Sequence, residues 1–192
     1  MIILFCICLL ICIFLHELSH LIVAKKCNCG VEVFSVGFGK PIYSFEYKET
    51  RYNFTPWLLG GYCKLAGELE LSDKSTDFSN LPYHKKFYIT IAGCVMNILS
   101  GLVGLGLGYL LFNRNLAYFG VLSITLGVGN LLPIPALDGF YIIGLPLCLK
   151  VWGKERGYEI FALINKIGFI IIIAINILCI PWLIHLIKNG GM

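Results

Sequence analysis

Four long apolar segments constrain this chain more than any other feature. They cover about residues 2–24, 87–112, 116–149 and 160–187, and a helix needs roughly 20 apolar residues to cross a bilayer. Hydrophobic residues make up 58% of the chain and charged residues 14%, whereas soluble domains have about 25% charged residues. The sequence therefore predicts an all-α polytopic membrane protein with about four transmembrane helices, which together form a single domain over residues 1–192.

The third apolar segment is too long for one simple span. Pro133, Pro135 and Pro146 lie within it, and proline inside a helix removes a backbone hydrogen bond and clashes with the preceding turn. We therefore expect this segment to be broken or kinked.

Residues 25–86 form the one sizeable loop that the sequence predicts. Aromatic residues alternate with polar ones around a polar turn at 48–51, which is typical of a β-hairpin. The apolar stretch 56–68 is too short to span a membrane, and this length favours an interfacial or re-entrant segment. The sequence therefore predicts a membrane-associated β-hairpin and re-entrant loop between the first and second spans.

Positive charge gathers in two loops. Nine of the fifteen Lys and Arg residues lie in 25–86, and three more lie in 150–156. Because basic loops stay on the cytoplasmic side, both termini are expected outside and these loops inside a bacterial cell membrane. The basic residues lie in short loops beside apolar spans, a pattern that does not indicate nucleic-acid binding.

The nine cysteines do not indicate a disulfide framework. Their number is odd, there is no paired CxxC spacing, and most lie in apolar runs, where cysteine behaves as a small hydrophobe. Cys27 and Cys29 are too close in sequence for the usual zinc-ligand spacing. The N-terminus also lacks the basic region and the small-residue cleavage site of a signal peptide.

Two acidic residues lie within the apolar segments, and they are Glu17 and Asp138. An acid inside a membrane costs about 2.5–3.5 kcal/mol on insertion scales and indicates a functional site. With a rise of 1.5 Å per helical residue, both acids are expected near the cytoplasmic ends of inward-running spans. The sequence therefore predicts that Glu17 and Asp138 share one site.

Glu17 lies in the sequence His16-Glu17-Leu18-Ser19-His20. Histidines four residues apart project from one face of a helix, and in HExxH they bind zinc while the glutamate acts as general base. Zinc needs a third protein ligand and an open position, and Asp138 can supply the ligand. The alternative is that His16 and His20 only form hydrogen bonds between packed helices.

These residues carry a family resemblance. Residues 16–20 and the sequence NLLPIPALDG at 130–139 resemble the HExxH and NxxPxPxxDG motifs of the site-2 protease family of intramembrane zinc metalloproteases, peptidase family M50. Residues 60–68 are similar to the re-entrant segment of that family, and 87–97, with its GxxxN pattern, resembles its second core span. The resemblance covers most of the chain in order.

The resemblance implies roles for particular residues. His16, His20 and Asp138 would bind one Zn²⁺ per chain, Glu17 would be the general base, and Asn130 would position substrate or stabilise the developing oxyanion. An interhelical hydrogen bond is an equally acceptable role for Asn130.

The chain departs from the family in several places. Cys94 stands where many members have proline, and this difference is expected to affect packing only. The connection at 113–115 leaves no room for a PDZ domain, and no CBS pair precedes Met192. The chain is therefore similar to a minimal form of the family, the catalytic core by itself.

The sequence also predicts roles for Asn97 and for the edge of the expected hairpin. Asn97 is expected to be structural, because small residues recur every four positions on both sides of it and form close-packing helix faces. A strand edge near 37–47, or in the re-entrant segment, is expected to hold an unwound substrate by strand addition, unless the hairpin only shields the site.

The predicted function is therefore a membrane zinc endopeptidase that cleaves transmembrane segments of other membrane proteins. Its expected partners are such a substrate, the lipid bilayer and a regulatory membrane protein. The alternatives are a metal-ion transporter and a proteolytically silent binding protein. A metal-ion transporter would not need Glu17 as a general base. A proteolytically silent protein would have lost catalytic residues, whereas all of them are present in this sequence.

Overall fold

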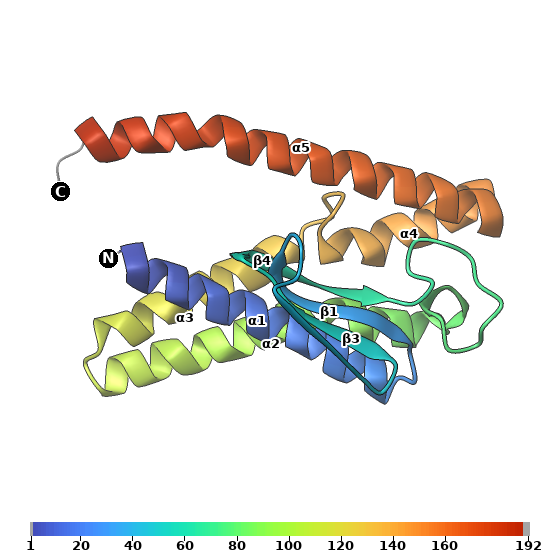
Figure 1. The fold of residues 1–192 in the computed structure, drawn as a ribbon, viewed down its shortest axis with the longest axis horizontal. Helices are drawn as coiled ribbons and strands as arrows, with labels where there is room; N and C mark the ends of the chain where they lie inside the picture. The colour runs from blue at the N-terminus through green and yellow to red at the C-terminus, as the bar shows by residue number, and fades with distance from the viewer. Residues whose placement is uncertain (1, 190–192) are drawn as a thin grey trace. The chain divides into compact units, whose positions relative to one another are not determined.

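The computed structural model describes residues 2–189, so both ends of the expected 1–192 domain lie outside the described residues. The chain divides into two compact units, residues 1–132 and 133–192. Helices dominate both units, and a small sheet lies in the first (Figure 1).

Three helices form the frame of the first unit. They are α1 (Ile2–Lys26), α2 (Tyr83–Leu110) and α3 (Arg114–Asn130). A tight connection makes α2 and α3 an antiparallel pair (Figure 1), and Asn113 Oδ1 caps α3 by accepting hydrogen bonds from the backbone N–H groups of Asn115 and Leu116 at 3.0 and 3.2 Å. Such a cap satisfies N–H groups that have no partner inside the helix.

Small residues let α2 and α3 approach closely. A Cβ atom at Gly101 would lie 2.7 Å from the carbonyl oxygen of Gly120, and one at Gly108 would lie 2.6 Å from the backbone nitrogen of Ala117. The predicted close-packing faces of α2 are therefore confirmed, as is typical of membrane helices that associate through small residues.

The loop between α1 and α2 folds into a four-stranded sheet, which is larger than the predicted hairpin. Its strands are β1 (Val31–Phe38), β2 (Tyr43–Tyr47), β3 (Thr50–Phe54) and β4 (Trp57–Leu65), in the spatial order β2-β3-β1-β4. The predicted hairpin is confirmed as β2 and β3. The stretch expected to be interfacial or re-entrant forms β4, an edge strand antiparallel to β1.

The turn between β2 and β3 has a backbone conformation that is typical of hairpins, which is why the sequence predicted this hairpin. Lys48 and Glu49 both have positive φ, at 48° and 61°, as a two-residue type I′ turn requires. Tyr47 pairs with Thr50 directly across it. By contrast, 18 residues separate the end of β1 from the start of β4, so no local turn signal predicts that these two strands pair.

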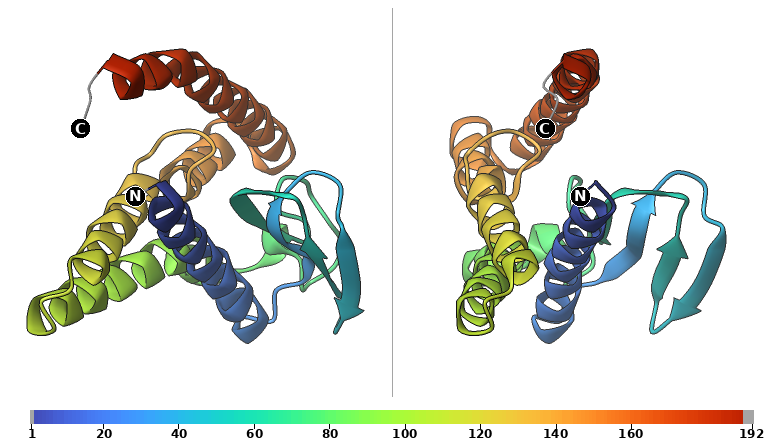
Figure 2. Two further views of the ribbon diagram at one scale, coloured as in Figure 1. Left: turned by 60° about the vertical axis from the view of Figure 1, so that its left-hand side comes forward. Right: turned by 90° about the vertical axis from the view of Figure 1, so that its left-hand side faces the viewer.

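Helix α1 packs against both parts of the first unit. Figure 2 shows the sheet on one side of α1 and the α2–α3 pair on the other, and α1 contacts α2, β4 and β1. The rings of Phe14 on α1 and Phe34 on β1 meet edge to face, with centroids 6.2 Å apart. This packing fixes which face of α1 is turned toward α2 and which toward β4.

The second unit consists of α4 (Asp138–Trp152) and α5 (Lys154–Asn189). The predicted break in the 116–149 segment is confirmed, since α3 ends at Asn130 and α4 begins at Asp138. Pro133 and Pro135 lie in this break, whereas Pro146 lies inside α4 without ending it.

Among the residues that the structure describes, three helices are long and apolar enough to cross a membrane, and they cover Ile3–Lys26, Tyr83–Leu110 and Lys154–Ile175. The predicted count of four spans is not confirmed, because the broken 116–149 segment gives the shorter helices α3, with 17 residues, and α4, with 15. The short 3₁₀ helix η1 (Phe78–Asn80) lies between β4 and α2 in the sequence.

Candidate metal centre

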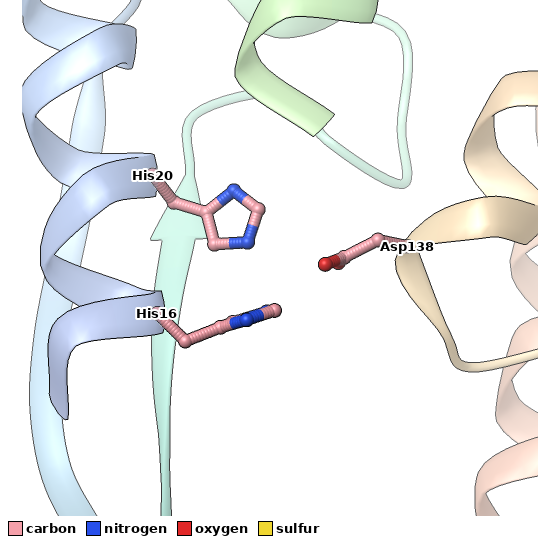
Figure 3. A group of neighbouring side chains, drawn as sticks. All are labelled: His16, His20 and Asp138. Carbon is pink, nitrogen blue, oxygen red and sulfur yellow. The ribbon is translucent and has the colours of Figure 1, made fainter. Parts of the chain in front are cut away.

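The two histidines of the HExxH sequence lie one turn apart on α1. Figure 3 shows both imidazoles projecting from the same side of the helix, and their ring centroids are 4.9 Å apart. His16 is only 7% exposed. The spacing of four residues therefore produces what the sequence predicted, a pair of ring nitrogens on one buried helix face.

A backbone carbonyl determines the tautomer of His20. Its Nδ1 lies 2.7 Å from the carbonyl oxygen of Ile89 on α2, and a carbonyl oxygen can only accept a hydrogen bond. Nδ1 must therefore carry the proton, and the lone pair of Nε2 is left available to a metal. Outer hydrogen bonds of this kind orient metal-binding histidines.

The Nε2 atoms of both histidines converge on Gly93 of α2. A Cβ atom placed at Gly93 would overlap Nε2 of His16 and Nε2 of His20. Any other residue at this position would fill the space into which the two nitrogens point. The glycine therefore lets α2 lie close against the two imidazoles.

Glu17 points from α1 toward the sheet. It lies among residues of β1 and β4, and a Cβ at Gly61 on β4 would lie 3.3 Å from Cγ of Glu17. Burial raises the pKa of the neighbouring Cys63 thiol well above its usual range, and the Glu17 carboxylate adds to the rise. The edge strand β4 therefore runs beside the expected general base.

Asp138 belongs to the second unit, where it is the first residue of α4. The helix dipole favours a carboxylate at this end. The preceding loop is held by Asn165 of α5, whose Oδ1 accepts a hydrogen bond from the backbone N–H of Ala136 at 2.9 Å. Ala136 has φ of +76°, an uncommon conformation for a residue other than glycine, so this bond supports a strained turn two residues before Asp138.

Asn130 is the last residue of α3 and is half-buried. It lies at the start of the break between α3 and α4. Its role in substrate binding or oxyanion stabilisation stays a prediction.

Three features of the site were not predicted from the sequence. They are the close approach of Gly93 to both imidazoles, the carbonyl of Ile89 as a partner of His20, and a contact between Asn97 and His16. Gly93 and Asn97 form the GxxxN pattern of α2, which predicted a packing face and a resemblance to the second core span of the family but no contact with the histidines. A backbone carbonyl has no sequence signal at all.

A pair of histidines on an apolar helix, with a glutamate between them, defines a class: membrane proteins that carry the HExxH motif of zinc metallopeptidases. The family model for peptidase family M50 matches residues 4–114, which is more than half of the chain. The chain belongs to this family.

Curated relatives agree with the family. A Thermotoga maritima protein named "Putative zinc metalloprotease" is 33% identical over 162 residues, which are 82% of this chain and 28% of that protein. A Borreliella burgdorferi protein of the same name is 41% identical over 103 residues, 47% of this chain and 23% of that protein. The chain therefore spans only about a quarter of the length of the relatives it matches.

Proposed function

We propose that this protein is an intramembrane zinc endopeptidase. The single observation that carries the proposal is the arrangement of His16 and His20, whose imidazoles project from one side of α1 and whose Nε2 atoms both lie against Gly93. Membership of peptidase family M50 and the names of the relatives support the choice of zinc and of peptide hydrolysis.

Asp138 is proposed as the third ligand. Asp138 offers a carboxylate at the start of α4, and it is the residue that the NLLPIPALDG sequence assigns to the metal by its resemblance to the family motif. Two histidines and one carboxylate leave a fourth position open, as catalytic zinc sites require. Bound zinc would polarise the scissile carbonyl and acidify the attacking water.

The other residues of this chain would carry out the remaining chemistry. Glu17 accepts the proton of the attacking water and then donates it to the leaving amide nitrogen, the usual double task of a general base. Asn130 donates a hydrogen bond from its amide to the developing oxyanion. An oriented donor in a site that excludes water contributes several kcal/mol, about 2.7–4 in measured cases.

The proposed substrate is a transmembrane helix that unwinds at the site. Three helices that could cross a membrane support a location in the bilayer, and the basic loop 25–86 supports an orientation with the site near the cytoplasmic face. The bilayer and a membrane-protein substrate are the proposed partners.

The zinc content of ligand variants tests this function. Asp138→Ala should lower the zinc content of the purified protein well below one ion per chain, because two histidines leave the coordination shell incomplete. The measurement is metal analysis of detergent-purified protein beside cleavage of a model membrane substrate. Stoichiometric zinc in a variant with both His16→Ala and His20→Ala would refute the site.

The edge strand β4 is the proposed substrate-binding strand. Both β2 and β4 are edges of the sheet, but β4 is the edge with Gly61 beside Glu17. An extended substrate added to β4 would therefore pass the general base. Strand addition relies on backbone hydrogen bonds, so most side-chain changes there should have small effects.

Proline substitutions distinguish the two edges. Proline removes an N–H group, so single prolines at 60–65 in β4 should reduce cleavage at alternate positions, following the outward-facing amides. Prolines at 43–47 in β2 are the matched control and should leave cleavage nearly unchanged. Zinc content should stay normal at the sensitive β4 positions. Equal tolerance of both strands would mean that the sheet is only a scaffold.

A further inference from the structure

Asn97 of α2 is buried in the helix packing with only 1% of its surface exposed. Its carboxamide nitrogen Nδ2 lies 3.3 Å from Nδ1 of His16. Its oxygen Oδ1 is also buried and has no hydrogen-bond partner among the described residues.

The direction of the contact between Asn97 and His16 decides whether His16 can bind a metal. If Nδ2 donates to Nδ1, the imidazole carries its proton on Nε2, which then has no lone pair for an ion. The oxygen and nitrogen of a carboxamide have nearly the same shape and exchange places by a half-turn. After this exchange Nδ1–H donates to Oδ1, and the lone pair of Nε2 becomes available.

His20 provides an independent reference for the tautomer. The carbonyl of Ile89 requires the proton of His20 on Nδ1, and Nε2 of both histidines faces the same position beside Gly93. The two rings can act as equivalent ligands only if His16 also carries its proton on Nδ1. Asn97 is the residue in contact with that atom.

We propose that Asn97 is a positioning residue for His16. Its Oδ1 accepts a hydrogen bond from Nδ1–H and so fixes the tautomer and the ring orientation that metal binding needs. The inference rests on the proposed zinc site, and it gives Asn97 a role that acts through His16 rather than as a ligand. Ser123 of α3 donates a hydrogen bond to the backbone carbonyl of Asn97 at 2.8 Å, which links this residue to the third helix as well.

Three variants separate the acceptor from simple packing. Asn97→Leu keeps the volume but removes the acceptor, and Asn97→Asp restores an acceptor at the same place. Ser123→Ala is the matched control, since it disturbs the same helix contact without changing the carboxamide. Losing an outer partner of a metal-binding histidine typically weakens metal binding about 10- to 100-fold, and we expect that loss for Asn97→Leu only.

The first measurement is zinc affinity by competition with a chelator. Asn97→Asp and Ser123→Ala should stay within about threefold of the wild-type affinity, well short of the loss expected for a missing outer partner. Unchanged affinity in Asn97→Leu would overturn the inference. Equal losses in Asn97→Leu and Asn97→Asp would overturn it too, because the acceptor would then not be the cause.

The second measurement is the tautomer of His16 in metal-free protein, read from the ¹⁵N shifts of labelled imidazole. Nδ1–H in the wild type supports the inference, and Nε2–H overturns it. This result does not depend on zinc, so a wild type that binds no zinc would refute the proposed function while the role of Asn97 is still decided. Because it uses the wild-type protein, this measurement also tests the inference if Asn97→Leu fails to fold.

Discussion

Replacing Glu17 by glutamine should abolish peptide cleavage while the protein keeps its fold and its zinc. The amide has nearly the same shape as the carboxylate but cannot accept the proton of the attacking water. A positioned general base contributes about 10²- to 10⁴-fold, so cleavage should fall by at least about 100-fold. The measurement is the rate of cleavage of a membrane substrate in detergent or vesicles, together with zinc content.

Glu155→Gln is the matched control for this variant. Glu155 is exposed in the first turn of α5, so the same change of charge there should leave the rate unaltered. Wild-type turnover in Glu17→Gln would remove Glu17 from the mechanism. It would also revive the reading of the protein as a transporter or as a silent binding protein.

Replacing Gly93 by alanine should prevent metal binding. A Cβ atom there would overlap the Nε2 atoms of both histidines, so the rings must turn away or α2 must move from α1. Cleavage and zinc content should both fall together, because the methyl group would displace the two imidazoles from their positions. Circular dichroism should show that the helices persist, since alanine favours a helix more than glycine does.

Gly106→Ala provides the comparison on the same helix. Nothing lies within 4 Å of a Cβ atom at Gly106, so this variant should bind zinc normally and gain about 0.5–1 kcal/mol of helix stability. If both alanine variants bind zinc equally, the nitrogens of His16 and His20 do not share the space beside Gly93.

Much of the fold was predictable because its signals are local. The length of the apolar segments predicted helices that could cross a membrane. The prolines at 133 and 135 predicted the break before α4, and the polar turn predicted the hairpin of β2 and β3. Each depends on residues within about one turn or one span. The spacing of His16 and His20 likewise placed two imidazoles on one helix face, because the α-helical period alone decides it.

Contacts between distant segments could not be predicted in this way. The pairing of β1 with β4, and of β1 in parallel with β3, depends on which strands meet after the chain has collapsed. The apolar stretch 56–68 was therefore read as an interfacial or re-entrant segment, although it forms an edge strand beside Glu17. No periodicity identifies the partner of a strand, since register and order are decided by packing.

The sequence by itself determined the HExxH motif, the identity of the candidate metal-binding side chains and the apolar character of the segments that carry them. Only the tertiary structure decided how those donors are oriented. The carbonyl of Ile89 sets the proton of His20, Gly93 leaves space for two ring nitrogens, and Asn97 reaches His16 from 81 residues away in sequence. The physical reason is that a tautomer and an open coordination position depend on atoms of a neighbouring helix, which the spacing along α1 cannot specify.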